Sequence, residues 1–357
     1  MRLYSIFLVL VVAIGFSSCG DKLNSTNSPF SNFDFEKWSA NYSTVGADRI
    51  ASIKDGIVKI KSIANSQNGT WSLSVLDSLK NEFNTTYLIY QEAESFQIGI
   101  AENLAMRSKL NTFPTDTVSV EGFVESENYN FDAVSHFASQ GLPALDYLLF
   151  AGSSAEILNR LNTESKYEAY LLALTSELNL FLAQIEGVEW LGSYASNSAF
   201  AANGPVSDVV NNFVFTFELC ARARVGIPLG KFSADIPLPE KVEGKFSKQS
   251  HALLYKNLQN LHQMYLGYEQ AGNGSGLEEL VLEVPSGSDL DNKIQTQFET
   301  VLDLASDLQS PIDVLVDSAP EQLEALYLEM KKLVVLIKVD MPSRLGVLIT
   351  YNDNDGD

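Results

Sequence analysis

A single carboxylate interrupts one of the most apolar stretches of the chain. Residues 137–150 read FASQGLPALDYLLF, and Asp146 is the only charged residue among them. A carboxylate that folding removes from water needs a partner, which makes Asp146 the first candidate for a binding site. If Pro143 takes the first position of a helix, Asp146 falls in its first turn, where an anion stabilises free backbone N–H groups. The sequence leaves both roles open.

Three more carboxylates could join Asp146 around a cation. They lie in segments that otherwise look helical and apolar: Glu92, Glu94 and Glu218. Hard cations and ferric iron accept oxygen ligands, so iron or another metal ion is the cofactor that such a set would hold. The alternative is that these carboxylates face solvent or pair with nearby arginines, for which the chain offers Arg107, Arg222 and Arg224.

The three histidines do not have the spacing of a zinc site. A zinc peptidase of the common helical type needs two histidines four residues apart. His251 and His262 are separated by about 16 Å along a helix that rises about 1.5 Å per residue, and His136 lies far from both in the sequence. The sequence therefore argues against a histidine-bound metal. Cys220, in an apolar helical run, is expected to be a small core residue and not a nucleophile.

The composition indicates a globular protein with an acidic surface. The 357 residues are 45% hydrophobic and 19% charged, which is enough to bury a large core. The 45 acidic and 24 basic residues give a formal charge of −21. This charge repels phosphate backbones, so nucleic acid is not an expected partner.

The first residues have the pattern of a lipoprotein signal. Arg2 precedes an apolar run over 3–16, and small residues stand directly before Cys19. The run is short for a membrane span and ends in a processing site. We expect residues 1–18 to be removed, a lipid on Cys19 to anchor the chain to a membrane, and residues 19–31 to form a tether. Simple secretion and an uncleaved anchor are the alternatives.

The spacing of apolar residues predicts an all-α fold. Positions three, four and seven apart recur along most of the chain. The expected helices cover these ranges: 33–64, 73–105, 128–151, 165–187, 207–226, 247–268, 288–308 and 320–339. They divide into two tandem bundles, 32–187 and 188–350, with a candidate site where the bundles meet. An acidic tail, 351–357, resembles the start of a calcium loop but lacks the acid that completes one, which favours a solvated tail.

One segment resembles a known family. GLPALDYLLF at 141–150 is similar to the signature segment of the imelysin-like proteins. Three further segments are similar to parts of envelope lipoproteins of that kind, namely GIPLG at 226–230, EGKFS at 243–247 and LGVLITY at 345–351. The resemblance implies two helical bundles with a site at their interface. It also implies anchoring in the bacterial cell envelope, at the outer membrane, and a link to iron uptake.

The family takes its name from a peptidase, and its pattern is Gly-x-His-x-x-Glu. Gly141 matches this pattern, whereas Pro143 stands at the histidine position and Asp146 at the glutamate position. A proline cannot bind a metal or act as a base. The resemblance therefore implies a ligand-binding site at these three residues without the family's catalytic set.

These observations favour a lipid-anchored, non-enzymatic envelope protein that binds iron or an iron-bearing ligand near Asp146. An imelysin-type metallopeptidase is the first alternative, although its metal ligands would have to come from elsewhere in the chain. A protein-binding accessory of an outer-membrane iron-uptake transporter is the second, because the acidic surface permits such a contact.

Overall fold

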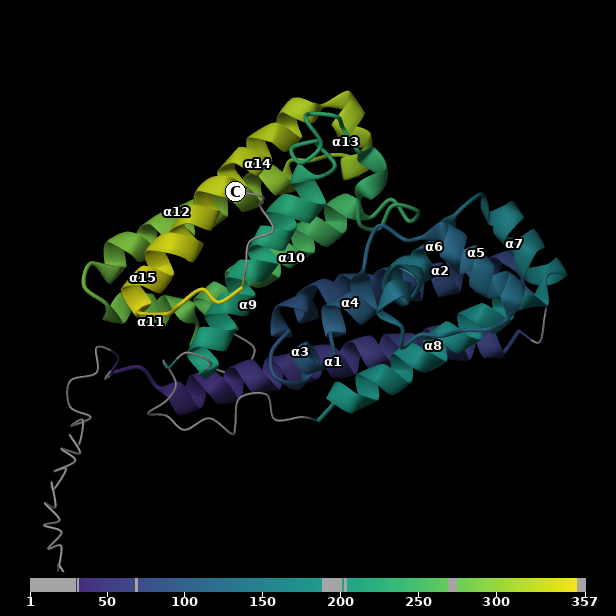
Figure 1. The fold of residues 1–357 in the computed structure, drawn as a ribbon, viewed down its shortest axis with the longest axis horizontal. Coiled ribbons are helices and arrows are strands. Elements are labelled where there is room, and N and C mark those ends of the chain that lie inside the picture. The colour runs from purple at the N-terminus through teal and green to yellow at the C-terminus, as the bar shows by residue number, and fades with distance from the viewer. Residues whose placement is uncertain are drawn as a thin grey trace, which may run out of the picture.

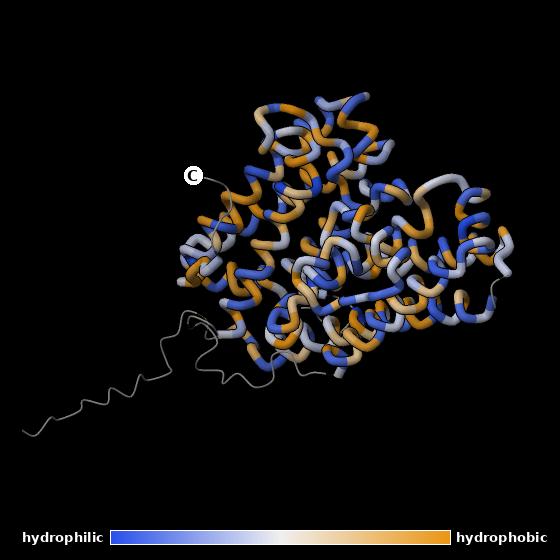
Figure 2. The backbone as a smooth tube through the Cα atoms, turned by 45° about the vertical axis from the view of Figure 1, so that its right-hand side comes forward, coloured by the Kyte–Doolittle hydropathy of each residue, from blue (hydrophilic) through white to orange (hydrophobic). Residues whose placement is uncertain are grey.

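The computed structural model describes residues 30, 32–67, 70–187, 201, 204–268 and 275–351. Helices joined by loops make up these residues, and no β-strand occurs within them, which confirms the all-α prediction. None of the described helices is both long and apolar enough to span a membrane. Along the helices, apolar and polar residues alternate in short stretches, as Figure 2 shows. The helices are therefore amphipathic and bury their apolar faces against one another.

The N-terminal helices are built around three long ones. Helix α1 packs against both α2 and α8, and shorter helices cover their exposed side (Figure 1). The long helices are α1 (Phe35–Asn65), α2 (Leu73–Ala93) and α8 (Ser165–Ile185). The short helices are α3 (Ile100–Asn103), α4 (Met106–Asn111), α5 (Thr117–Ser126), α6 (Gly141–Phe150) and α7 (Ser154–Thr163).

The start of α1 illustrates why these elements form where they do. The Asp34 side chain caps the helix by accepting a hydrogen bond from the backbone N–H of Lys37 at 3.0 Å. Buried residues then recur at three- and four-residue spacing, among them Trp38, Tyr42 and Val45. The cap gives a hydrogen-bond partner to a backbone N–H group at the start of the helix, and the face formed by the buried residues packs into the core. The expected helix over 33–64 is therefore present.

The C-terminal helices form a second packed group. Within this group α12 packs on α14 and α10, and α10 also contacts α11. The helices are α9 (Pro205–Leu219), α10 (Ser250–Leu266), α11 (Leu277–Glu283), α12 (Gly287–Ser306), α13 (Ile312–Ser318), α14 (Pro320–Val335) and α15 (Met341–Leu345). The segment 345–350 continues from the end of α15 as irregular chain.

Two predicted helices are wrong in extent. The expected helix over 73–105 ends at Ala93 and continues as a 3₁₀ turn, η2 (Glu94–Phe96). Gly99 and Ala105 then take positive φ values of 56° and 55°, which an α-helix does not allow. The expected helix over 128–151 is helical only in α6, preceded by a 3₁₀ segment, η3 (Val134–Ser139). Periodicity missed both breaks because the apolar spacing persists through the turns.

A π-helical turn follows α9 and carries a buried charged side chain. Helix α9 passes directly into η5 (Cys220–Gly226), whose wider turn contains Arg224. Turns of this kind often accompany functional sites because the extra residue re-aims a side chain. A second π turn, η8 (Leu336–Asp340), extends α14 to about the residue where the sequence predicted the helix to end.

The two groups of helices meet along α2 and α10. Helix α10 packs on α2 and on η2, and α9 also contacts η2. In Figure 1 the N-terminal helices lie below and to the right of the C-terminal helices, with α10 between them. The loop between η6 (Pro239–Lys241) and α10 reaches across to α6.

Candidate functional site

A buried ionic cluster lies where the two groups of helices meet. We call it the Arg224 cluster, and its members are Arg224, Glu94, Glu243, Gln91 and Asn257. Arg224 is only 1% exposed although it is a charged side chain. Burial alone would lower the pKa of Arg224, but the carboxylates of Glu243 and Glu94 raise it well above its ordinary value. The guanidinium therefore keeps its charge in the core.

Glu94 is fully buried at the start of η2. Its Oε2 atom accepts hydrogen bonds from Arg224 Nη2 at 2.8 Å and from Asn257 Nδ2 at 2.7 Å. Its Oε1 atom lies 3.4 Å from Arg107 Nε, too far and poorly aligned for a hydrogen bond. Because Glu94 follows α2 whereas Arg224 and Asn257 belong to the C-terminal group, the ion pair joins the two groups.

Glu243 supplies the second carboxylate from the loop before α10. It accepts a hydrogen bond from Arg224 Nε at 2.5 Å on Oε2. Its Oε1 atom accepts from Gln91 Nε2 at 2.7 Å and from Asn111 Nδ2 at 2.6 Å. Removing one partner of such a buried pair costs about 3–5 kcal/mol, because it leaves the other charge uncompensated. The loop is thus fixed on the N-terminal helices.

Asp146 holds the same loop a few residues further on. The carboxylate is 2% exposed and accepts two backbone hydrogen bonds, from Phe246 N at 2.9 Å and from Ser247 N at 2.8 Å. Burial raises the pKa of Asp146 to about 6, although the hydrogen bonds from Ser247 and Phe246 oppose the shift. Asp146 is the sixth residue of α6, so its expected place in the first helical turn is wrong. Its hydrogen-bond partners are backbone N–H groups of the loop before α10.

Gly141 and Pro143 set the direction of α6. Gly141 has a φ of +76°, and a Cβ atom there would lie 2.5 Å from the carbonyl oxygen of Leu110. Only glycine fits this close approach of α4 and α6 without strain. Pro143 is the third residue of α6 and not the first, and its carbonyl accepts a hydrogen bond from Thr115 Oγ1 at 2.8 Å.

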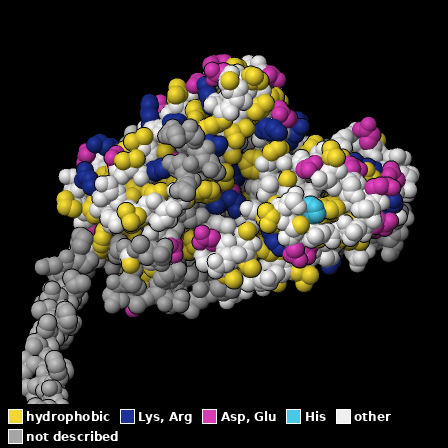
Figure 3. Space-filling view, viewed as in Figure 1, with side chains coloured by type: hydrophobic (Ala, Val, Ile, Leu, Met, Phe, Trp, Pro, Cys, Tyr) yellow, Lys and Arg dark blue, Asp and Glu magenta, His cyan; other side chains and the backbone are white. Residues whose placement is uncertain are grey.

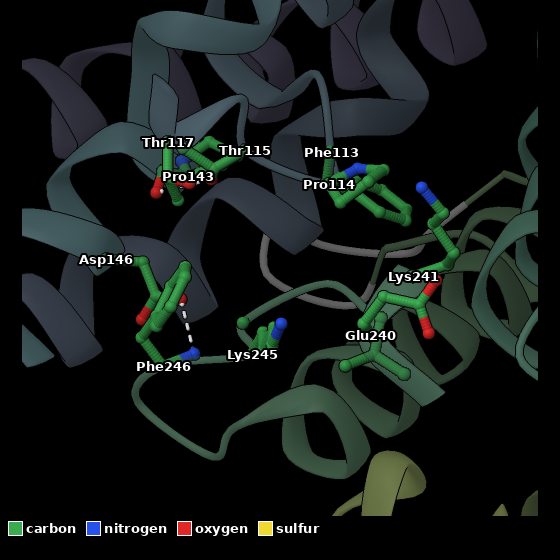
Figure 4. A pocket seen from close by; sticks show the side chains of 12 residues that line it. Phe113, Pro114, Thr115, Thr117, Pro143, Asp146, Glu240, Lys241, Lys245 and Phe246 are labelled. Atoms are coloured by element: carbon green, nitrogen blue, oxygen red, sulfur yellow. Dashed lines mark hydrogen bonds between the residues drawn. The ribbon is translucent and has the colours of Figure 1, made fainter. Parts of the chain in front are cut away.

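A pocket of about 150 Å³ opens beside Asp146, and we call it the Asp146 pocket. Its lining residues are Phe113, Pro114, Thr115, Thr117, Pro143, Asp146, Glu240, Lys241, Val242, Gly244, Lys245 and Phe246. Figure 4 shows Asp146 and Phe246 on one side, Phe113 and Pro114 across from them, and the Lys245 amine between. Figure 3 shows the surface hollowed between the two groups of helices, with Lys and Arg side chains beside the hollow.

Two lysines line the Asp146 pocket. Neither Lys241 nor Lys245 forms an ion pair with any residue that the structure describes, and Lys245 lies over the ring of Phe246 at 5.5 Å. Two amines without an ion-pair partner in the described part of the chain thus lie in one pocket of a protein of net charge −21. The lining also includes the carboxylates of Glu240 and Asp146, and backbone N–H groups already occupy the Asp146 carboxylate. The two amines are therefore the groups of this pocket that can attract an anionic ligand.

A comparison with known families agrees with this architecture. A family model described as Imelysin matches residues 66–337. The chain belongs to the imelysin family. The correspondence of Pro143 and Asp146 to the histidine and glutamate of the imelysin pattern stays a prediction from the sequence. In the structure, Asp146 holds the loop before α10.

Two solved structures share the imelysin fold with this chain. One is a protein named as an iron-regulated protein A precursor from Parabacteroides distasonis ATCC 8503, with 14% identity and a TM-score of 0.68 over 87% of this chain and 95% of that one. The other is an imelysin-like protein from Psychrobacter arcticum 273-4, with 17% identity and a TM-score of 0.68 over 88% and 98% of the two chains. No curated protein sequence matches the chain.

The four carboxylates proposed as metal ligands are not brought together. Glu92 pairs with Arg49 and Lys256, Glu94 belongs to the Arg224 cluster, and Asp146 is occupied by backbone N–H groups. Glu218 pairs with Lys338 at 2.8 Å and accepts a hydrogen bond from the Tyr351 hydroxyl, on the far side of α9.

Within the described ranges, no group of three or more His, Cys, Asp and Glu side chains could hold a metal ion. Both carboxylate oxygens of Asp146 and of Glu243 accept hydrogen bonds from N–H groups. Glu94 accepts two on Oε2, and its Oε1 lies beside the Arg107 guanidinium, so these residues do not fit an iron ion bound directly by the protein.

The histidines and Cys220 have structural partners. His136 Nδ1 and His251 Nε2 lie within hydrogen-bond distance of the carbonyls of Asn130 and Ala305. His262 stacks on Phe298 with ring centroids 5.0 Å apart. Burial raises the pKa of the Cys220 thiol to about 12, and it donates to Asn257 Oδ1. The sequence placed Cys220 in the core, which is confirmed.

The sequence did not single out Glu243 and Arg224 as a pair. They are 19 residues apart and meet only because the loop before α10 folds back over η5. Both residues lie in or next to segments that resemble the family: Glu243 begins EGKFS, and Arg224 lies just before GIPLG. Their opposite charges alone gave no reason to expect a contact between them. Cys19, most of the tether, residues 188–200 and the tail after Tyr351 lie outside the described residues.

Proposed function

We propose that this chain is a lipid-anchored, non-enzymatic envelope protein that binds an anionic iron chelate in the Asp146 pocket during iron acquisition. The observation that carries the proposal is the pair of amines of Lys241 and Lys245, which form no ion pair with a described residue, on an otherwise acidic chain. A chelate brings its own oxygen ligands to the iron. The protein then needs only to recognise the chelate's negative charge, which lysines do well.

Three further observations support this proposal. The family is imelysin, and one relative with the same fold is named as iron-regulated. The lipid on Cys19 would hold the protein at the outer membrane, where an iron-uptake transporter is the proposed partner. We also propose that the two groups of helices are two bundle domains, 32–187 and 188–350, so that the pocket between α6 and the loop before α10 lies at their junction.

Calorimetric titration with ferric citrate tests this function. We expect saturable binding by the wild-type protein and at least about tenfold weaker binding by Lys245→Gln, because one charge-assisted contact contributes about 1.5–3 kcal/mol. Asp146→Asn should also weaken binding while the helical circular dichroism stays intact, because the loop that carries Lys245 loses its anchor.

The matched control is Lys293→Gln, at an exposed lysine on α12 that pairs with Asp289. It should bind ferric citrate as the wild type does. Equal affinity for ferric citrate in Lys245→Gln and wild type would rule the Asp146 pocket out. Zinc-dependent cleavage of an unstructured peptide, abolished by a chelator, would instead favour the metallopeptidase alternative.

A further inference from the structure

A second cavity, of about 240 Å³, lies between α1, α2 and α10. It is separate from the Asp146 pocket and shares no lining residue with it. Residues of both groups of helices line it: Arg49 comes from α1, Glu92 from α2, and Lys256, Gln259 and Gln263 from α10. The α10 residues are three, four or seven positions apart, so they form one stripe along the helix that faces the cavity.

The cavity carries an excess of positive charge. Glu92 Oε2 lies 2.7 Å from Arg49 Nε, and its other oxygen pairs with Lys256 Nζ. Two cations therefore share one carboxylate, which leaves a net charge of +1 in a concave site on an acidic protein. The three side chains are 22%, 15% and 37% exposed for Arg49, Glu92 and Lys256, so a solute can reach them.

The cavity also offers hydrogen-bond donors that nothing in the described structure uses. The Nη groups of Arg49 donate to no described residue, and its Nε, although close to Glu92, is poorly aligned for a hydrogen bond. The side-chain amides of Gln259 and Gln263, one turn apart on α10, have no partner among the described residues. A guanidinium, an amine and two amides converging on one space are a donor set for an oxyanion.

We propose that this cavity binds the carboxylate or phosphate group of a small polar molecule. The oxyanion contacts Arg49 and Lys256 and accepts hydrogen bonds from the amides of Gln259 and Gln263. Glu92 occupies the same two cations in the free protein, so it competes with the ligand. Removing the charge of Glu92 therefore tightens binding, whereas a purely structural ion pair would give no gain.

Titration of the wild-type protein with succinate and, separately, with inorganic phosphate at low ionic strength tests the proposal and distinguishes the two ligand sources. We expect saturable binding of at least one anion, weakened about tenfold or more by Arg49→Gln and by Lys256→Gln. Glu92→Gln should bind the same anion more tightly than wild type. Gln263→Leu, at an exposed position, should weaken binding without disturbing the fold.

Two control variants separate this cavity from other cationic sites. Lys332→Gln removes an exposed amine on α14, and Lys293→Gln removes an exposed amine on α12. Both should bind the anion as wild type does. The proposal is overturned if neither anion binds saturably at millimolar concentration, if Lys245→Gln abolishes binding while Lys256→Gln does not, or if Glu92→Gln leaves the affinity unchanged.

Discussion

Asp146 is a carboxylate on which burial and hydrogen bonding act in opposite directions. Burial dominates and raises its pKa to about 6, against about 3.9 in an unfolded chain. Between about pH 4 and pH 6 the folded protein therefore holds a proton that the unfolded chain has released. The contribution of Asp146 to the free energy of unfolding is fully present below about pH 4 and falls by about 3 kcal/mol as the pH rises to 7.

Urea unfolding at several pH values between 4 and 7 measures this effect when wild type is compared with Asp146→Asn. The variant cannot titrate at this position, so the difference in unfolding free energy between the two proteins should change across the window and level off above about pH 6. A difference that stays constant from pH 4 to pH 7 would show that the backbone N–H groups of Phe246 and Ser247 keep the carboxylate ionised throughout.

The sequence identified Asp146 correctly as a buried carboxylate but did not predict the backbone groups that it meets. Its apolar neighbours were enough to predict burial, because burial follows from local composition. Its partners come from residues 246 and 247, a hundred positions later, and no local pattern encodes that contact. The same holds for three other carboxylates, each of which forms an ion pair with a different basic residue in the folded chain: Glu92, Glu94 and Glu218. The sequence did not predict which residue that would be.

At the scale of single elements, α6 depends on its first residue. Gly141→Ala should destabilise the protein by at least about 1–3 kcal/mol, because alanine strains a positive φ and its Cβ would overlap the Leu110 carbonyl. Gly122→Ala is the matched control, since a Cβ there, within α5, meets nothing within 4 Å. It should stabilise the protein by about 0.4–1 kcal/mol. Thermal unfolding of both variants measures these changes, and equal destabilisation would contradict the assigned role of Gly141.

The existence of most helices was predictable, and their breaks were not. The buried residues of α1 recur at regular spacing, and the helix ends near the predicted residue. The helix expected over 73–105 passes after Ala93 into the 3₁₀ turn η2, in which the Glu94 side chain meets Arg224 and Asn257, and the helical path ends at Gln97 and Gly99. The partners of Glu94 come from residues more than a hundred positions later, and a periodic pattern does not encode such contacts.

At the scale of the whole molecule, the Arg224 cluster should couple the unfolding of the two groups of helices. Wild type is expected to unfold in one calorimetric transition, because Glu94, Gln91, Arg224 and Asn257 are buried together at the junction. Arg224→Met leaves Glu94 and Glu243 without their shared counter-ion, at a cost of about 3–5 kcal/mol. Since that cost falls on the contact between the groups, the variant should show two separate transitions.

The control for this prediction removes a lysine from an ion pair that lies within a single helix. Lys332 is 63% exposed on α14 and pairs with Glu329, so Lys332→Met should change stability by less than about 1 kcal/mol and keep one transition. A lower melting temperature for Arg224→Met with a single transition would mean that apolar contact between α2 and α10 couples the groups without the cluster. Two transitions already present in wild type would mean that the two groups of helices unfold independently. The Arg224 cluster would then not couple their unfolding.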